Sequence, residues 1–469
     1  MNLQENKKFI NQQWDNSIIP ALSDYIRIPN KSPAFDPDWQ ANGHMAQAVK
    51  LIVDWCKTNA VESMQLDVVQ LANRTPLLFI EIPGSSNETI LLYGHLDKQP
   101  EMQGWESNLG PWNPVIKGDK LYGRGAADDG YAIFASLTAI NALRAQQQPH
   151  ARCIIIIEAS EESGSSDLVH YIDALKERIG QPDLVICLDS GCGNYEQLWL
   201  TTSLRGLVNG SLTINVLKEG VHSGSASGIV PACFRILRQL LNRIESATTG
   251  EILLSDLFVD IPGIRSHQAE QAVQVLGKTI FDKLPFQKQV QPQSNNLQDL
   301  LLNQTWRPAL SIIGIEGIPS IAYAGNVTLP SLTVKLSMRL PPTCNAEHAA
   351  CTLKTTLEQN PPYQAQIRFD IHDAGSGWNA PAEKAWLTTA THEISKNYFG
   401  KEAVYLGEGG SIPFMGMLGK RFPQAQFLIT GVLGPASNAH GPNEFLHIPT
   451  GKKLTCCIAE IIAKHYARR

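Results

Sequence analysis

Short, mainly apolar runs alternate with helical patterns along residues 1–205 of the chain. Four of these runs have the length and composition of strands buried on both faces of a sheet: 77–82, 89–93, 153–157 and 184–188. Residues 131–143 lie between the second and third runs and carry apolar side chains at helical spacing. This part of the chain is therefore expected to form an α/β sheet flanked by helices.

The middle of the chain has a different pattern. Residues 210–217 and 331–339 alternate between apolar and polar positions, as strands with one solvent-exposed face do. Residues 233–244 and 346–357 have the apolar spacing of amphipathic helices. An antiparallel sheet with two helices on one face is predicted here. The tract 246–305, in which Pro, Gln and Asn are scattered, is interpreted as an elaborated connection.

After Gly375 the first pattern returns, with a helix, a strand and a helix predicted at 383–398, 426–430 and from about 450 onward. At 469 residues the chain is longer than one hydrophobic core usually supports, so two domains are expected. The predicted fold class is α/β, a discontinuous domain with a second, α+β domain inserted in its middle. The pieces of the discontinuous domain are residues 1–205 and 376–469, and the inserted domain is residues 206–375.

The composition narrows the classes of partner. Hydrophobic residues make up 43% and charged residues 18% of the chain, which is ordinary for a soluble globular protein. The net charge is −5 and Lys and Arg form no long block, so no nucleic-acid partner is expected. No apolar run resembles a signal-peptide core or approaches the roughly 18–20 residues that cross a bilayer, so no membrane partner is expected. The nine cysteines are an odd number without CxxC spacing, which favours a reduced, cytoplasmic setting.

Side chains that can bind metal follow four of the predicted strands. They are His95 with Asp97, Glu161 with Glu162, Asp189, and His440. Two more carboxylates, Asp128 and Asp129, lie at the glycine-rich entry to the helix 131–143. Because ligands of open α/β sheets bind beyond the carboxyl ends of the strands, these groups are expected to converge.

Several carboxylates buried together need cations to neutralise them. Two divalent ions are the natural solution, and zinc accepts a mixed set of histidines and carboxylates, as Mn and Co also do. Each motif alone is weak, because a Glu-Glu pair is commonly a solvated helix start and an Asp after a strand is commonly a turn residue. The order and spacing of the whole set make the metal site the better interpretation.

The chain resembles the co-catalytic zinc exopeptidases, the family that groups carnosinases, glutamate carboxypeptidases and aminoacylases. The resemblance spans roughly residues 70 to 450 and rests on an ordered series of segments: YGHLDKQP, YGRGAADDG, ASEESGS, LDSG, VHSG, LSMRLPP, GEGGSIPF and AHGPNE. HLDKQP and EGGSIP favour the carnosinase-type dipeptidase branch. The resemblance implies a zinc-exopeptidase-like catalytic domain with a mixed sheet flanked by helices, and an inserted domain that closes over substrate and forms a homodimer.

The resemblance also assigns roles to the strand-end residues. Asp128 would bridge the two metals, and the remaining ligands would be His95 and Asp189 at one site and Glu162 and His440 at the other. In members of the family the peptide bond after the bridging Asp is cis, which implies a cis bond between Asp128 and Asp129.

Two side chains beside the metals have other implied roles. Asp97 would accept the ring N–H of His95 and fix its tautomer. Glu161 would bind no metal and would act as the general base, taking a proton from the attacking water and passing it to the leaving amine.

Further motifs imply residues that handle the substrate. Arg339 resembles the arginine that clamps the free carboxylate of the substrate, a planar task that suits a guanidinium. His222 resembles a histidine that stabilises the oxyanion and that comes from the partner subunit in dimeric members. The loop implied to line the pocket of the leaving residue comprises Glu408, Gly409, Gly410 and Ser411.

Two positions depart from the usual pattern of the family. Gly130 follows the paired aspartates where a Lys is common, and Lys98 follows Asp97 where a small apolar residue is usual. Neither change removes a ligand, but both lie beside the site, so they bear on the substrate and not on the reaction.

The leading hypothesis is a metallo-exopeptidase that cleaves a dipeptide or short peptide with a free carboxyl terminus. An N-acyl-amino-acid amidohydrolase would use the same metals and the same arginine, and the sequence hardly separates the two. A non-catalytic binding homologue is a third reading, disfavoured because no ligand and no base is missing. The native metal, the side chains of the substrate and whether His222 acts in cis or in trans stay open at this point.

Overall fold

The chain forms two compact units in the computed structural model, which describes residues 1–410 and 413–468. Unit 1 comprises Met1–Thr202, Ala380–Leu406 and Met417–Arg469, and unit 2 comprises Ser203–Asn379 and Gly407–Gly416. Three elements cross the points of division along the chain: β8 (Trp199–Leu204), β16 (Val404–Glu408) and α15 (Pro413–Arg421). The short piece 407–416 thus separates from the rest of the C-terminal segment, whereas the sequence pattern assigned all of 376–469 to one domain; the predicted domain limits stay a prediction.

A mixed sheet of six strands forms the centre of unit 1, in the order β1-β2-β6-β3-β7-β17. Its strands are β1 (Gln65–Val69), β2 (Leu77–Ile82), β3 (Thr89–His95), β6 (Arg152–Glu158), β7 (Pro182–Cys187) and β17 (Gln426–Ile429). The strands β6, β3, β7 and β17 run parallel to one another, whereas β2 is antiparallel to both of its neighbours, β1 and β6. The carboxyl ends of the four parallel strands therefore lie at one edge of the sheet.

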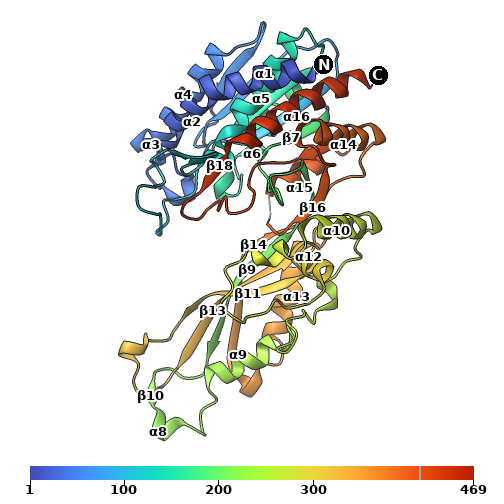
Figure 1. Cartoon of the computed structure of the whole chain (residues 1–469). Coiled ribbons are helices and arrows are strands. Elements are labelled where there is room, and N and C mark those ends of the chain that lie inside the picture. The colour runs from blue at the N-terminus through green and yellow to red at the C-terminus, as the bar shows by residue number, and fades with distance from the viewer. Residues whose placement is uncertain (411–412, 469) are drawn as a thin grey trace. The chain divides into compact units, whose positions relative to one another are not determined.

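Helices cover this sheet and enclose its apolar strands. They are α1 (Leu3–Gln13), α2 (Ile19–Ile26), α3 (Trp39–Asn42), α4 (His44–Thr58), α5 (Tyr131–Ala145), α6 (Leu168–Ala174), α7 (Lys176–Ile179), α14 (Ala385–Phe399) and α16 (Ile448–Ala467). The helices α5 and α16 lie side by side (Figure 1), and most of their side chains are buried. A smaller sheet in the same unit has the order β18-β5-β4, with β4 (Val115–Lys117), β5 (Lys120–Tyr122) and β18 (Phe445–His447).

Unit 2 is built on an antiparallel sheet of the order β11-β13-β9-β14. Its strands are β9 (Gly206–Asn215), β11 (Ala309–Glu316), β13 (Ser331–Leu340) and β14 (Gln366–Gly375). Alternate side chains of β9 and β13 are buried, as the alternating sequence pattern predicts. They share a hydrophobic core with α9 (Cys233–Leu241) and α13 (Ala346–Glu358), so the predicted sheet with two helices is confirmed.

The tract predicted to be an elaborated connection contains three helices: α10 (Gly263–Leu276), α11 (Thr279–Asp282) and α12 (Leu297–Thr305). Few of their side chains are buried, so their sequence lacks a clear apolar stripe. Asn296 caps α12 by accepting hydrogen bonds from the backbone N–H groups of Gln298 and Asp299, and this cap was the available signal.

The remaining short elements of unit 2 are α8 (Ser223–Ala226), β10 (Val221–His222), β12 (Val327–Thr328) and β15 (Trp378–Asn379). Figure 1 shows α8 and β10 at one end of this unit, with α10 and α12 towards its other end. Across the described residues of both units, every helix is too short or too polar to cross a membrane.

Candidate metal centre

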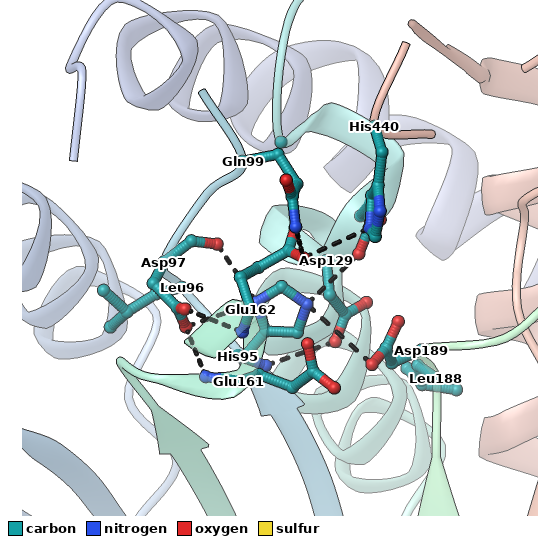
Figure 2. A network of polar contacts seen from close by, with 12 residues as sticks. His95, Leu96, Asp97, Gln99, Asp129, Glu161, Glu162, Leu188, Asp189 and His440 are labelled. Carbon is teal, nitrogen blue, oxygen red and sulfur yellow. Dashed lines mark hydrogen bonds and ion pairs between the residues drawn. The ribbon is translucent and has the colours of Figure 1, made fainter. Parts of the chain in front are cut away.

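The parallel strands deliver the predicted metal-binding side chains to one edge of the sheet in unit 1. His95 is the last residue of β3, and Asp189 follows the end of β7. Glu161 and Glu162 begin a short 3₁₀ helix just beyond β6. His440 lies in the loop between β17 and β18. Figure 2 shows these side chains gathered around one volume, with Asp97 on the side away from Asp189.

The carboxylate of Asp128 faces both histidines. Its Oδ1 lies 3.2 Å from Nε2 of His95, and its Oδ2 lies 3.0 Å from Nε2 of His440. Nε2 of His440 is also 3.1 Å from Oε2 of Glu162, and Nε2 of His95 is 3.8 Å from Oδ2 of Asp189. Asp128 thus divides the set into two groups, one around each histidine.

This arrangement fits divalent cations. Potential ligand atoms of His95, Glu161 and Asp189 lie within 4.8 Å of one another, and so do those of His95, Asp128 and Glu162. Burial raises the pKa of Asp189 to about 7, and burial together with the charge of Asp189 raises the pKa of Glu161 well above its usual value. The carboxylates therefore repel one another's negative charge, and a positive ion among them would relieve that repulsion.

Asp128, the carboxylate predicted to bridge the metals, differs from its neighbours. Burial alone would raise the pKa of Asp128, but its hydrogen bonds to His440 and His95 outweigh burial and hold that pKa below its usual value. Burial lowers the pKa of His440, whereas its hydrogen bonds to Asp128 and Glu162 raise it to about 11. Asp128 is thus the carboxylate of the cluster that stays ionised most readily, which the predicted bridging role requires.

Asp97 holds the two glutamates in place through their backbones. Its Oδ1 accepts the N–H of Glu161 at 3.1 Å, and its Oδ2 accepts the N–H of Glu162 at 3.0 Å. Nδ1 of His95 lies 3.1 Å from the backbone oxygen of Asp97 and 3.5 Å from the nearer carboxylate oxygen. The contact of the His95 ring with the Asp97 carbonyl is therefore shorter than its contact with the carboxylate that was predicted to accept its N–H.

Asp129 is a buried neighbour to which the sequence assigned no role. The peptide bond between Asp128 and Asp129 is cis, as the resemblance implies. Oδ2 of Asp129 accepts the backbone N–H of His95 at 3.3 Å, so this side chain links the glycine-rich loop to the end of β3. Gln99 likewise supports Glu162, since its Nε2 donates to Oε2 of Glu162 at 2.6 Å.

A buried ion pair joins the loop of Asp128 to the loop of His440. Nη1 of Arg124 lies 2.6 Å from Oε2 of Glu444, and both side chains are almost fully buried. Arg124 also donates to the carbonyl of Gly441 at 2.7 Å, next to His440. Oε1 of Glu444 accepts the N–H of Gly125 at 2.9 Å. Sequence reasoning missed this pair, although both residues lie inside the motifs that it quoted.

The two departures from the family pattern pack around one aromatic ring. Nζ of Lys98 lies 3.8 Å from the ring centroid of Tyr25 and donates to the carbonyls of Tyr25 and Ile28, both at 2.8 Å. A Cβ on Gly130 would lie 2.3 Å from Cε1 of the same ring. Gly130 and Lys98 thus form one packing unit with Tyr25, whose hydroxyl donates to the carbonyl of Leu96 beside the ligands.

The predicted substrate-binding residues lie in unit 2, except that Ser411 falls outside the described residues. Arg339 is half-buried near the end of β13, and Glu408 and Gly410 lie in the piece 407–416. His222 ends β10, where it pairs with Val327 of β12. His222 therefore lies near the start of β13, and the unit does not bring it close to Arg339.

A mixed α/β sheet that gathers two histidines and several carboxylates beyond its parallel strands is the arrangement expected of a metal-dependent hydrolase. Residues 91–464 match the peptidase family M20/M25/M40, and the chain belongs to that family. It is accordingly a metallopeptidase, and the predicted zinc-exopeptidase fold is confirmed.

Several characterised proteins are similar to the chain. The cysteinylglycine-S-conjugate dipeptidase of Corynebacterium striatum is 26% identical over 401 residues, which are 82% of this chain and 84% of that protein. The Beta-Ala-His dipeptidase of Mus musculus is 28% identical over 347 residues, which are 70% of this chain and 68% of that protein. The crystal structure of human carnosine dipeptidase 1 superposes with a TM-score of 0.78 at 20% identity and covers 98% of both chains.

Proposed function

We propose that the protein hydrolyses the amide bond of a dipeptide or short peptide with a free C-terminal carboxylate, using two divalent metal ions and Glu161 as the general base. The observation that carries this proposal is the placement of Asp128, whose two oxygens face His95 and His440 separately. The similarity to the dipeptidases of Corynebacterium striatum and Mus musculus supports the substrate class.

Each ion would have three ligands from the chain, with Asp128 shared. His95 and Asp189 would complete one site, and Glu162 and His440 the other. Three protein ligands leave a position open for water or substrate, as catalytic zinc sites require. Bound there, the ions would polarise the scissile carbonyl and lower the pKa of the attacking water. Zinc suits this ligand set, and Mn or Co would also be accepted.

Glu161 takes none of these six positions, although its carboxylate lies within 4.8 Å of ligand atoms of His95 and Asp189. The carboxylate of Asp97 accepts the backbone N–H of Glu161, which fixes the backbone that carries the Glu161 side chain. Glu161 would accept a proton from the attacking water and deliver that proton to the leaving amine. The Glu161 carboxylate lies close enough to His95 and Asp189 to bind a metal with them, so a direct test must separate a base from a ligand.

His222 is suited to stabilise an oxyanion. Its Nδ1 accepts the N–H of Gly224 at 3.1 Å, so a neutral ring carries its proton on the exposed Nε2 and can donate it. Arg339, the proposed clamp of the substrate carboxylate, lies near the other end of β13. At about 3.3 Å per residue this strand separates the two by roughly 25 Å, which a dipeptide cannot bridge. We therefore place His222 in the active site of a partner subunit, within a homodimer formed through unit 2.

A reducing cytoplasmic setting is part of the same proposal. All nine cysteines are free thiols, and most of them are buried. Cysteines persist in this state where glutathione and thioredoxin keep them reduced.

A substrate panel tests the function. The metal-loaded protein is given unmodified dipeptides and the matching N-acetylamino acids, and release of the C-terminal amino acid is measured. Faster cleavage of the dipeptides is expected. A clear preference for the acetylated substrates would instead identify an N-acyl-amino-acid amidohydrolase.

The variant Glu161→Gln tests the base in the same assay. Its turnover should fall by about 10²–10⁴-fold while its metal content stays at the wild-type level. Unchanged turnover would show that Glu161 is not the base, and loss of metal would show that it is a ligand. Wild-type protein that binds metal but cleaves neither class of substrate would favour a binding homologue.

A further inference from the structure

A buried arginine that the sequence did not single out contacts the loop proposed to hold the leaving residue. Arg205 precedes β9 in unit 2 and is only 9% exposed. Its Nε donates to the carbonyl of Gly409 at 3.1 Å, and its backbone N–H donates to the carbonyl of Gly410, also at 3.1 Å. Arg205 therefore donates hydrogen bonds to two successive carbonyl groups of the glycine loop.

The loop is also fixed from the side of α12. Nη1 of Arg205 donates to the carbonyl of Asn303 at 3.3 Å, so the guanidinium spans from the loop to the end of the helix. A Cβ on Gly409 would lie 3.1 Å from the carbonyl oxygen of Gln304 and 3.3 Å from Nη2 of Arg205. A side chain at 409 would therefore press against both neighbours, which would have to give by a few tenths of an ångström.

The hydrogen bond from Arg205 to the carbonyl of Gly409 sets the direction of the amide N–H of Gly410. In a planar trans peptide the carbonyl and the following N–H point in opposite directions. Because the carbonyl of Gly409 points at Arg205, the N–H of Gly410 points to the opposite face of the loop. Gly410 is exposed, and a Cβ there would meet nothing within 4 Å, so a substrate has room to approach.

Arg205 lies beside the proposed carboxylate clamp. In the register of the sheet, Arg339 of β13 pairs with Leu207 of β9, and Leu340 pairs with Gly206, the residue after Arg205. Burial and the positive charge of Arg339 lower the pKa of Arg205 to about 10, which still leaves both arginines charged at neutral pH. Two positive charges at one place favour an anion such as a carboxylate.

We propose that Arg205 is a positioning residue for the C-terminal carboxylate of the substrate: it turns the N–H of Gly410 towards the leaving residue and adds a second positive charge beside Arg339. This inference rests on the proposed peptidase function. It makes recognition of the free carboxylate a joint property of Arg205, the glycine loop and Arg339.

The surroundings of Arg205 allow a clean test. Arg205 lines a cavity of about 1030 Å³ in unit 2 and belongs to no cluster of apolar core residues, so Arg205→Met is expected to leave the core intact. Arg307 lines the same cavity and pairs with Asp299 at 3.1 Å. Arg307→Met is the matched control, because it removes an arginine from the same cavity whose hydrogen bonds go to Asp299 and Asn303 and not to the glycine loop.

The test compares a dipeptide with its C-terminal amide for the wild type, Arg205→Met, Arg205→Lys and Arg307→Met. For Arg205→Met we expect KM for the dipeptide to rise about tenfold with kcat changed less than threefold, and the ratio of kcat/KM for dipeptide over amide to fall about tenfold. Arg205→Lys should be intermediate, since an ammonium keeps the charge but lacks the planar fork. Arg307→Met should match the wild type.

The outcomes separate this inference from the function on which it rests. An Arg205→Met protein with the wild-type ratio would overturn the role of Arg205 while leaving the peptidase function in place. An equal loss on both substrates, accompanied by a lower melting temperature, would reduce Arg205 to a structural anchor and also overturn it. A wild-type protein inactive on both substrates would overturn the proposed function, and the role of Arg205 with it.

Discussion

The position of His440 depends on residues that bind no metal. Half of the His440 side chain is exposed, and its loop is fixed mainly through the contact of Arg124 with the carbonyl of Gly441 and the pairing of Arg124 with Glu444. The Arg124–Glu444 pair is buried, so removal of one partner leaves an uncompensated charge. Arg124 thereby connects the stability of the fold to the geometry of one half of the proposed metal centre.

Arg124→Met should separate the two halves of the metal centre. We expect the free energy of unfolding to fall by about 3–5 kcal/mol, the usual effect of breaking a buried pair. Metal titration should show that the ion held by His440 and Glu162 binds more weakly than the ion held by His95 and Asp189. Lys50→Met, which breaks the exposed pair with Asp54, is the control and should change neither quantity measurably. A destabilised Arg124→Met protein with two equally tight ions would show that the pair serves stability alone.

At this scale the sequence predicted the candidate ligands because each follows a strand or a glycine-rich turn. It could not predict that the carboxylate of Asp97 binds the backbones of Glu161 and Glu162, because those contacts join segments distant in the chain. The same holds for Arg124 with Glu444 and for Arg205 with Gly409. Residue types and spacing indicate which chemistry is present, whereas the tertiary structure decides which neighbour each group contacts.

Among the elements, β3 and α5 position central residues of the candidate site. The strand β3 ends in His95, and α5 directly follows the loop of Asp128 and Asp129. Gly94 is the residue of β3 before His95, and it lies against α5. A Cβ there would be 2.6 Å from Cβ of Ala132 and 2.7 Å from Oδ2 of Asp129. No side chain fits at this contact. The close approach of strand and helix is what brings Asp129 to the backbone of His95.

Gly94→Ala should therefore force α5 away from β3. Overpacking of this kind costs about 1–3 kcal/mol, and we expect a corresponding loss in the free energy of unfolding together with weaker metal binding. Gly263→Ala is the matched control, because a Cβ on Gly263 meets nothing within 4 Å and alanine is favoured in a helix. Chemical denaturation and metal titration of both variants check the prediction. Equal behaviour of the two variants would contradict the steric argument.

Elements with a strong pattern were predicted well, and those with a weak pattern were not. The apolar runs of β2, β3, β6 and β7 and the helix α5 are buried as expected, because burial on both faces demands continuous apolar sequence. The helices α10, α11 and α12 were missed, because they bury few side chains and their sequence has no apolar stripe. Tertiary contacts, more than sequence periodicity, determine where such helices form.

At the scale of the whole molecule, the end of unit 2 that carries His222 presents unusually exposed apolar side chains. Ile321 is 96% exposed, Tyr323 is 87% exposed and Ile229 is 81% exposed. All three lie close in sequence to β10, α8 or β12, the elements around His222. Large apolar side chains gathered at one end of a unit favour a protein–protein contact, which supports the proposed homodimer.

Two experiments test this assembly. Ile321→Asp should convert a dimer into a monomer in sedimentation, while Ile116→Asp, at an exposed isoleucine of unit 1, should leave the dimer intact. If His222 acts across the dimer, mixing inactive His222→Ala with inactive Glu161→Gln should restore activity, since one site of each mixed dimer has both residues. A monomeric wild type, or mixtures without recovered activity, would contradict the action of His222 in trans. The arrangement of the subunits could not be predicted from the sequence, which describes one chain.

The central claim is that Asp128 joins two metal ions held by His95 with Asp189 and by His440 with Glu162. Its most direct test is the metal content of purified wild-type protein and of Asp128→Ala, measured by mass spectrometry after equilibration with the same excess of zinc and removal of the free ion. The predicted result is two ions per wild-type chain and fewer than one per Asp128→Ala chain, because both ions lose a shared ligand. One ion per wild-type chain, or two ions in both proteins, would contradict it.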